Sequence, residues 1–348
     1  MAYTTINKST DYFNTKLYTG TGSTNAITGV GFQPDWTWIK NRDGTDDHKT
    51  FDAVRGVTKV LKTNTTGPET TDSNTLSAFG TDGFTVGSDG GVNGNGDNFA
   101  SWNWKAGTGQ GSPNTDGSIN TSYTSVNTTA GFSISKYAGY GSASTVGHGL
   151  GAAPEVIIIK STTHTENWVM YHKGLNPSGA GNYIYFNNAA VGGSGSNTSI
   201  FNNTAPTSSV FSVNTDGVSN GSGKSYVAYC FKEKPGYSKF GTYVGNGNAD
   251  GTFVYTGFKP AFVLVKRYDG AGLSWRFFDS KRNYNGDREF MYVNLSDSEV
   301  GGDNMDFLSN GFKNRNTSGH QNGNGDDYIY MAFGQSLVGT NNIPATAR

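Results

Sequence analysis

The fold is decided by a stretch that the chain contains three times, first as Gly31-Phe32-Gln33-Pro34-Asp35-Trp36-Thr37-Trp38-Ile39-Lys40. The other copies are Gly151-Ala152-Ala153-Pro154-Glu155-Val156-Ile157-Ile158-Ile159-Lys160 and Gly257-Phe258-Lys259-Pro260-Ala261-Phe262-Val263-Leu264-Val265-Lys266. Proline has no N–H to give to a β ladder, so it favours the start of a strand. The β-branched and aromatic residues after it are typical of the strand itself. The stretch therefore predicts the same strand in three units.

Two further motifs flank each copy in a constant order. A Tyr-x-Gly-x-Gly element precedes the strand, and an Asn-Gly-x-Gly turn with a final strand closes the unit. Asn-Gly is a strong hairpin signal because both residues tolerate positive φ. The elements begin at Tyr18, Tyr137 and Tyr243, and the turns begin at Asn93, Asn220 and Asn322. Repeats of this kind indicate tandem triplication of one all-β unit.

We therefore predict three tandem, jelly-roll-like β-sandwich units packed against one another. The predicted boundaries are an N-terminal arm (1–16), unit 1 (17–107), a linker (108–123), unit 2 (124–235), unit 3 (236–338) and a C-terminal tail (339–348). The linker is assigned from its Gly-, Ser- and Thr-rich composition.

The strands differ in how they should pack. The closing strands alternate at period two, for example Ala100, Trp102 and Trp104 on one face, which predicts a half-buried strand with one core face. The proline strands are apolar on both faces and should be covered twice. Either a neighbouring unit or a long loop would supply the second cover, and the sequence leaves both open.

Composition excludes several classes of protein. The chain has 348 residues with Gly 50, 13% aromatic residues and only 15% charged residues, too aromatic for a disordered chain. A net charge of −1 argues against nucleic acid, which needs a basic surface. Cys 1 excludes an intrachain disulfide and a thiolate metal cluster. No apolar run suits a signal peptide or a membrane span, so we expect folding in a cytoplasm without membrane insertion.

Several motifs look catalytic, but we predict no catalytic residue and no cofactor. Gly217-Val218-Ser219-Asn220-Gly221 matches the nucleophile elbow, yet it precedes a predicted strand where the elbow needs a helix. Gly221-Ser222-Gly223-Lys224-Ser225 resembles the end of a phosphate loop and fails for the same reason. The histidines, which we expect in surface loops or turns, are His48, His148, His164, His172 and His320.

Paired charges recur in units 1 and 3 as Asp52 with Arg55 and Asp279 with Arg282. Glycosidase-like acids would need two carboxylates at a defined separation. Unit 2 has His172 in place of the aspartate, so we interpret the pairs as ion pairs or turn caps. On this interpretation, changing both aspartates to asparagine should alter stability only slightly.

Ligand contacts are predicted on the Asn-Gly turns, because binding residues concentrate in loops of rigid β scaffolds. The candidates for glycan or ion contact are Asn95, Asp97, Asn98, Asn324, Asp326 and Asp327. Their oxygens could suit calcium, but unit 2 has Lys224 and Ser225 there, so no metal site is predicted. Trp36 and Trp38 share a strand face as sugar-stacking platforms do, yet their apolar equivalents predict core positions.

Several strings resemble an uncharacterised repeat family of virion proteins in marine tailed phages that infect cyanobacteria and marine heterotrophs. They are Tyr3-Thr4-Thr5-Ile6, Leu17-Tyr18-Thr19-Gly20, Gln33-Pro34-Asp35-Trp36, Trp102-Asn103-Trp104-Lys105-Ala106-Gly107, Val146-Gly147-His148-Gly149-Leu150, Ala228-Tyr229-Cys230-Phe231, Tyr237-Ser238-Lys239-Phe240-Gly241 and Tyr330-Met331-Ala332-Phe333. The resemblance covers all three units. It implies a structural protein of the particle, described as tail, fibre or other appendage, and it brings no catalytic residues.

The resulting expectation is a non-enzymatic virion protein, assembled in the host cytoplasm, that forms part of a tail or fibre. Its expected partners are other virion proteins, further copies of itself and host surface glycan, with no nucleic acid. A capsid decoration or head-fibre protein and a glycan depolymerase are the alternatives.

Overall fold

A computed structural model describes residues 4–176, 181–190, 197–270, 272–282, 285, 289–302 and 304–336. Helix within these ranges is limited to α1 (Gly90–Asn93) and the 3-10 turns η1 (Ser9–Asp11) and η2 (Lys173–Leu175). The fold is all-β, as predicted. None of the described helices has the length and apolar character that a membrane crossing requires.

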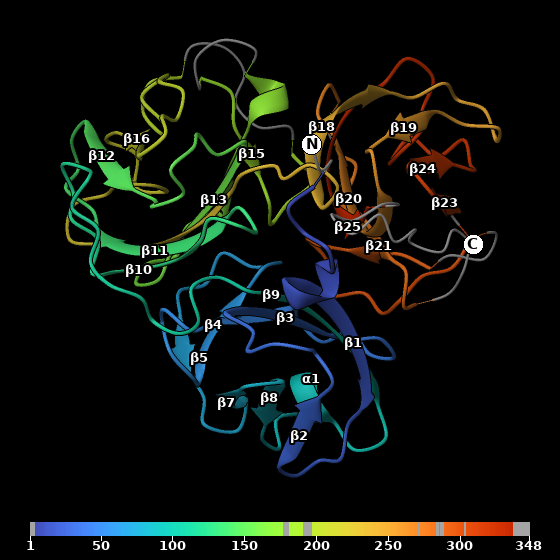
Figure 1. The fold of residues 1–348 in the computed structure, drawn as a ribbon, viewed down its shortest axis with the longest axis horizontal. Coiled ribbons are helices and arrows are strands. Elements are labelled where there is room, and N and C mark those ends of the chain that lie inside the picture. Colours follow the sequence, from blue (N-terminus) through green and yellow to red (C-terminus); the bar gives the residue numbers. More distant parts are fainter. Residues whose placement is uncertain are drawn as a thin grey trace.

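The strands form three β-sandwiches arranged around a common centre (Figure 1). In sandwich 1, the larger sheet has the order β1 (Phe13–Thr19), β9 (Asn98–Trp104), β3 (Trp36–Asn41), β4 (Lys49–Asp52), β5 (Lys59–Lys62), β6 (Thr70–Thr71). Its smaller sheet has the order β2 (Asn25–Thr28), β8 (Gly83–Val86), β7 (Leu76–Gly80).

Sandwiches 2 and 3 repeat this arrangement. The larger sheet of sandwich 2 is β10 (Tyr123–Asn127), β11 (Phe132–Ala138), β17 (Ser225–Phe231), β13 (Val156–Ser161), β14 (Val169–His172), β15 (Ile184–Tyr185), and the smaller is β12 (Ser144–Gly147) with β16 (Val210–Val213). The larger sheet of sandwich 3 is β18 (Ser238–Val244), β25 (Asp327–Gln335), β20 (Lys259–Arg267), β21 (Arg276–Asp279), β22 (Met291–Tyr292). Its smaller sheet is β19 (Phe253–Tyr255), β24 (Gly311–Asn314), β23 (Met305–Leu308).

The proline strands and closing strands have the same neighbours and the same register in all three sandwiches, whereas β10 is an additional strand beside β11 in sandwich 2. Each proline strand (β3, β13, β20) pairs with its closing strand, so that Trp36 lies opposite Trp104, Val156 opposite Phe231, and Phe262 opposite Phe333. The three sandwiches thus share one strand order across the larger sheet. Their origin by triplication stays a prediction.

The larger sheets face the centre of the molecule and the smaller sheets face outward (Figure 1). The inward faces form one shared hydrophobic core, in which the ring centroids of Trp36 and Tyr229 lie 4.6 Å apart, as do those of Trp102 and Phe277. Neighbouring units therefore supply the second cover of the proline strands. Trp36 and Trp38 are core residues, as predicted.

The prediction that the closing strands are half-buried is wrong, because their second face also lies in a core. Phe99, Tyr226 and Tyr328 pack inside their own sandwiches. Polar residues on that face are buried and paired: Thr37 donates to Asn103 Oδ1 at 3.1 Å. In these strands a polar residue therefore indicates a buried hydrogen bond and not exposure to solvent.

Equivalent side chains tie each sandwich to the one before it. Trp168 Nε1 donates to the carbonyl of Lys62 in sandwich 1 at 2.9 Å, and Trp275 Nε1 donates to that of Tyr185 in sandwich 2 at 2.9 Å. The strand-end lysines act similarly, because Lys160 donates to the Thr66 carbonyl of sandwich 1 at 3.0 Å. These bonds and the shared core join the sandwiches into one body.

The described parts of the predicted arm and linker are also packed. Ile6 and Phe13 of the arm lie in the shared core. In the predicted linker, Ile119 is buried in sandwich 2, and Ser112 forms a bridge with Thr124. The predicted tail, 339–348, lies outside the described residues.

Candidate functional site

The Asn-Gly turns are fastened to the Tyr-x-Gly-x-Gly elements by a buried asparagine side chain. Asn93 Oδ1 accepts a hydrogen bond from Thr21 N at 2.9 Å. The equivalent bonds are Tyr140 N to Asn220 Oδ1 at 2.8 Å and Asn246 N to Asn322 Oδ1 at 3.1 Å. The side chains of these asparagines are therefore part of the scaffold.

Close backbone contact explains the first glycine of the Tyr-x-Gly-x-Gly element. A Cβ on Gly20 would lie 2.0 Å from the carbonyl oxygen of Gly94, and the equivalent distances at Gly139 and Gly245 are 2.4 and 2.3 Å. Only glycine allows two chains to come this near. The motif is thus explained by packing.

The predicted ligand contacts of unit 1 surround the tip of its turn. Asn95 is exposed. Asp97 Oδ2 accepts a hydrogen bond from Asn41 Nδ2 at 3.1 Å, and Asn98 N donates to Asp43 Oδ2 at 2.7 Å. The carboxylate of Asp97 thus already binds a scaffold amide.

The contacts of unit 3 behave similarly. Asn324 is exposed, whereas Asp326 forms an ion pair with Arg267 at 2.8 Å. Asp327 begins β25 and accepts a hydrogen bond from Tyr268 N at its carbonyl. The two sets belong to different sandwiches, and among the described residues no three His, Cys, Asp or Glu side chains form a group suited to a metal ion. Glycan contact at these turns stays a prediction.

The two motifs that imitate catalytic loops are used in packing. Ser219 is buried and its hydroxyl donates to the carbonyl of Ile200 at 3.1 Å. Lys224 forms an ion pair with Glu166 at 2.5 Å. Both residues precede strand β17, so the helix that either motif requires is replaced by a strand.

The Asp–Arg pairs are fully buried at the contacts between sandwiches. Asp52 pairs with Arg55 and accepts a hydrogen bond from the hydroxyl of Tyr229 at 2.7 Å. Asp279 pairs with Arg282 and accepts one from Trp102 Nε1 at 3.0 Å. Ion pairing and turn capping, as predicted, are therefore the observed roles of these aspartates.

Electrostatics within the second pair favour the charged form. Burial alone would raise the pKa of Asp279, but the Arg282 guanidinium and the N–H groups of Lys281 and Arg282 lower it below its ordinary value. The guanidinium of Arg282 also contacts Glu299 at 2.8 Å. Such a network suits a scaffold contact better than proton transfer.

The prediction that the histidines lie in surface loops is wrong for His48, His148 and His172, which are fully buried. His172 occupies the aspartate position in sandwich 2, and its Nε2 lies 3.2 Å from the carbonyl of Tyr330 in sandwich 3. Burial lowers the pKa of His172 to about 4, so the ring stays neutral. His164 is exposed and His320 is half-buried.

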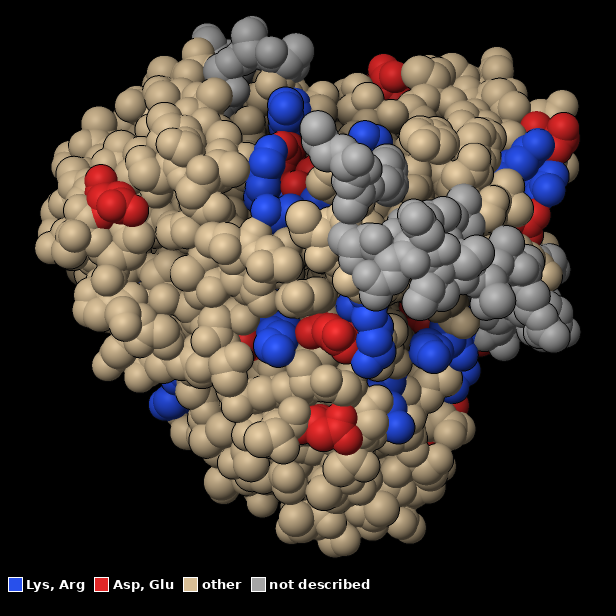
Figure 2. Space-filling view, viewed as in Figure 1, with Lys and Arg blue, Asp and Glu red and all other residues tan. Residues whose placement is uncertain are grey.

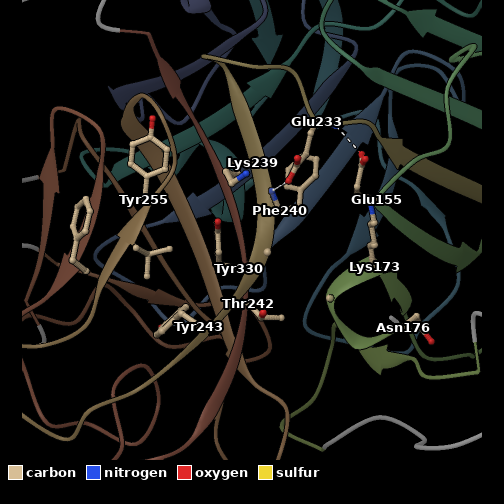
Figure 3. A pocket seen from close by; sticks show the side chains of 14 residues that line it. Glu155, Lys173, Asn176, Glu233, Lys239, Phe240, Thr242, Tyr243, Tyr255 and Tyr330 are labelled. Carbon is tan, nitrogen blue, oxygen red and sulfur yellow. Dashed lines mark hydrogen bonds between the residues drawn. The ribbon is translucent and has the colours of Figure 1, made fainter. Parts of the chain in front are cut away.

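A pocket of about 630 Å³ lies between sandwiches 2 and 3. Tyr255 lies on its sandwich 3 side, and Lys173 lies beside Glu155 on its sandwich 2 side, with Glu233 next to Glu155 (Figure 3). Glu155 accepts hydrogen bonds from the Lys232 ammonium group and from Glu233 N. The pocket thus combines an exposed aromatic ring with charged side chains.

The sequence contains a signal for this pocket, the aromatic residues of one strand, that a search for shared motifs does not reveal. Strand β19 holds Phe253 and Tyr255, both exposed, with Val254 buried between them. Strand registers place Thr145 and Gly147 at the equivalent positions in sandwich 2, and Ala26 and Thr28 in sandwich 1. Aligning the three repeats would have revealed aromatic residues at positions that the shared scaffold does not require.

Comparison with known proteins identifies a family that covers most of the chain. A family model described as "Domain of unknown function (DUF7483)" matches residues 8–336, a span that contains all three sandwiches. No curated protein and no solved structure matches the chain.

Proposed function

The chain belongs to the family described as a domain of unknown function, DUF7483, and we propose that it is a structural protein of a bacteriophage virion, forming part of a tail or fibre. The observation that carries the proposal is the shared core. Aromatic residues of all three sandwiches meet there, so one hydrophobic core holds three small sandwiches together. A shared core of this kind suits a particle component that must survive outside the cell.

The use of the polar residues supports the same role. Buried carboxylates, histidines and lysines bind scaffold groups of a neighbouring sandwich or of the backbone, as Asp279 and Lys160 do. The strings that resemble marine phage virion proteins add a second line of support. The proposed partners are other virion proteins and further copies of the chain within the particle.

Localisation on purified particles tests the proposal. Gold-labelled antibody raised against the chain should decorate the tail or its fibres, and antibody absorbed beforehand with the purified chain should not. Labelling confined to the capsid lattice would replace the tail role with a capsid decoration role. Failure to find the chain by mass spectrometry in infectious, gradient-purified particles would refute the virion role altogether.

Incubation with host polysaccharide separates binding from cleavage. We expect retention of the polysaccharide with no release of reducing ends, because no glycan-cleaving pair of carboxylates is assigned to the chain. Release of reducing ends would instead support a depolymerase.

A further inference from the structure

We propose that the pocket between sandwiches 2 and 3 binds an acidic oligosaccharide, with Phe253 and Tyr255 as the stacking surface and Lys173 and Lys239 as contacts for the acidic groups. Its role in host attachment rests on the proposed virion function, but the binding itself does not.

The pocket exists because one corner of sandwich 3 is uncovered. In sandwich 2, the residues before β11 cover that corner: β10 pairs with β11, which is the counterpart of edge strands β1 and β18, and Ile119 forms a bridge with Val146 of β12. The connection into sandwich 3 is only Lys234-Pro235-Gly236, which is too short to provide such cover. Edge strands β18 and β19 therefore border an open space.

An open corner does not by itself require aromatic residues. Edge strand β1 of sandwich 1 also borders a pocket, of about 450 Å³, lined by Phe13, Asn14 and Thr15. In sandwich 1 the positions equivalent to Phe253 and Tyr255 are Ala26 and Thr28, and neither of them lines this second pocket. Packing between sandwiches therefore gives no reason for the aromatic residues at these two positions of β19.

The exposure and spacing of the two rings suit a sugar. Phe253 and Tyr255 are 43% and 57% exposed, which is unusual for large aromatic side chains of this protein. Alternate residues of a strand project from the same face, so the two rings lie side by side along β19. The apolar C–H faces of pyranose rings pack on such aromatic surfaces, while the sugar hydroxyls remain available for hydrogen bonds.

The charge around the pocket selects an acidic sugar. Basic side chains line the hollow between the two sandwiches, with acidic groups among them (Figure 2). Glu155 is neutralised by Lys232, and the Glu233 carboxylate binds the backbone N–H of Phe240 at 2.6 Å. Lys173 and Lys239 lie on the pocket wall (Figure 3), where the charge of Lys239 also acts on the Glu233 carboxylate. At the equivalent pocket between sandwiches 1 and 3 the corresponding residues are Asn14 and Ser280, and the lysines that line it, Lys259 and Lys281, stand at other positions.

The same bond from Phe240 disfavours a polypeptide ligand. An added strand would have to pair with the open edge of β18, as β10 pairs with β11. Glu233 occupies the N–H of Phe240 on that edge, which is how proteins block strand addition with an inward-pointing charge. Side chains and not backbone groups are thus offered to the ligand.

The test uses the full chain against an array of acidic oligosaccharides (uronic, sialic and sulfated) and neutral oligosaccharides of equal length, followed by calorimetry. We expect binding to at least one acidic class and weaker binding to neutral sugars. Phe253→Ala with Tyr255→Thr, the residues of sandwich 1, should weaken binding by at least about tenfold, equal to about 1.4 kcal/mol. Lys239→Asn should weaken binding and reduce its dependence on salt.

Tyr140→Thr is the matched control, since Tyr140 is 56% exposed and does not line the pocket. It should bind as the unchanged chain does, and all variants should keep the same unfolding temperature. Binding to no acidic sugar below about 1 mM, or binding that the β19 variant leaves intact, would overturn the proposal. Protection of β18 amides by a virion polypeptide and by no sugar would replace it with strand addition. Absence of sugar binding by a chain located on the tail would refute the pocket alone, and sugar binding by a chain absent from particles would refute the virion role alone.

Discussion

Replacing Asp279 by asparagine should destabilise the protein by about 3 kcal/mol, because removal of one partner from a buried ion pair typically costs about 3–5 kcal/mol. Asp279 and Arg282 are both fully buried. The carboxylate accepts hydrogen bonds from Arg282 and from Trp102 of sandwich 1, and the new amide N–H₂ group would oppose one of these donors. Glu299 still pairs with Arg282, which places the cost at the lower end of the range.

The loss of stability caused by Asp279→Asn should also depend on pH. The folded-state pKa of Asp279 is below that of the unfolded chain, so its stabilising contribution is present above the unfolded value of about 3.9 and is lost as the pH falls through the folded value. The difference in unfolding free energy between the Asp279→Asn variant and the unchanged protein should therefore be largest at pH 7 and should decrease below about pH 4.

Urea unfolding at pH 7 and at pH 3 measures both effects. Asp250→Asn is the matched control: Asp250 also pairs with cations, Lys313 and Arg315, but it is 75% exposed, so no measurable change is expected. A loss below about 1 kcal/mol for Asp279→Asn at pH 7, or an equal loss for both variants, would refute the assignment of Asp279 as a buried scaffold charge. It would also restore the expectation from sequence that the charge matters little.

The remaining predictions concern the shared core, the glycine contact and the buried lysines. Trp36→Ala should lower stability by about 3–5 kcal/mol and speed hydrogen exchange in all three sandwiches, because Trp36 lies in the core they share; an effect confined to sandwich 1 would contradict this. Gly139→Ala should lower the unfolding temperature by several degrees, since its Cβ would lie 2.4 Å from the carbonyl oxygen of Gly221; an unchanged temperature would count against the close contact. Burial lowers the pKa of Lys160 and Lys266 to about 8, below the unfolded value of about 10.4, so the stability of the protein should rise between pH 8 and pH 10. Lys160→Met should make that rise smaller when the unfolding temperature is measured across this pH range. Equal rises for the variant and the unchanged protein would contradict the prediction.

Much of the fold could be predicted from short segments. Rules about single backbone positions identify the proline before or near the start of β3, β13 and β20. They also identify the Asn-Gly turn before each closing strand. The aromatic and β-branched runs then place the strands. All of these signals act within a few residues, which is why three copies could be recognised without a structure.

Burial of polar residues could not be predicted in this way. Histidine in a loop or turn is usually a surface residue, yet the Tyr330 carbonyl of sandwich 3 lies against the ring of His172. Asp52 looks like an exposed cap until Tyr229 of the next sandwich covers it. Each is buried by a residue more than a hundred positions away.

The candidate site divides in the same way. Asn95 and Asn324 lie at exposed turn tips, and their contact with glycan or ions stays a prediction. The pocket between sandwiches 2 and 3 was not foreseen, because it depends on which corner lacks a covering segment, and that depends on how the connections run in space.

By itself, the amino-acid sequence determined the β class, the recurrence of the strands along the chain and the place of the turns, because these follow from the backbone preferences of neighbouring residues. Only the tertiary structure decided that three sandwiches share one core, which charges are buried and where a pocket opens. Those properties depend on which surfaces meet, and the surfaces that meet here are made by residues such as Trp102 and Asp279 that lie far apart along the chain.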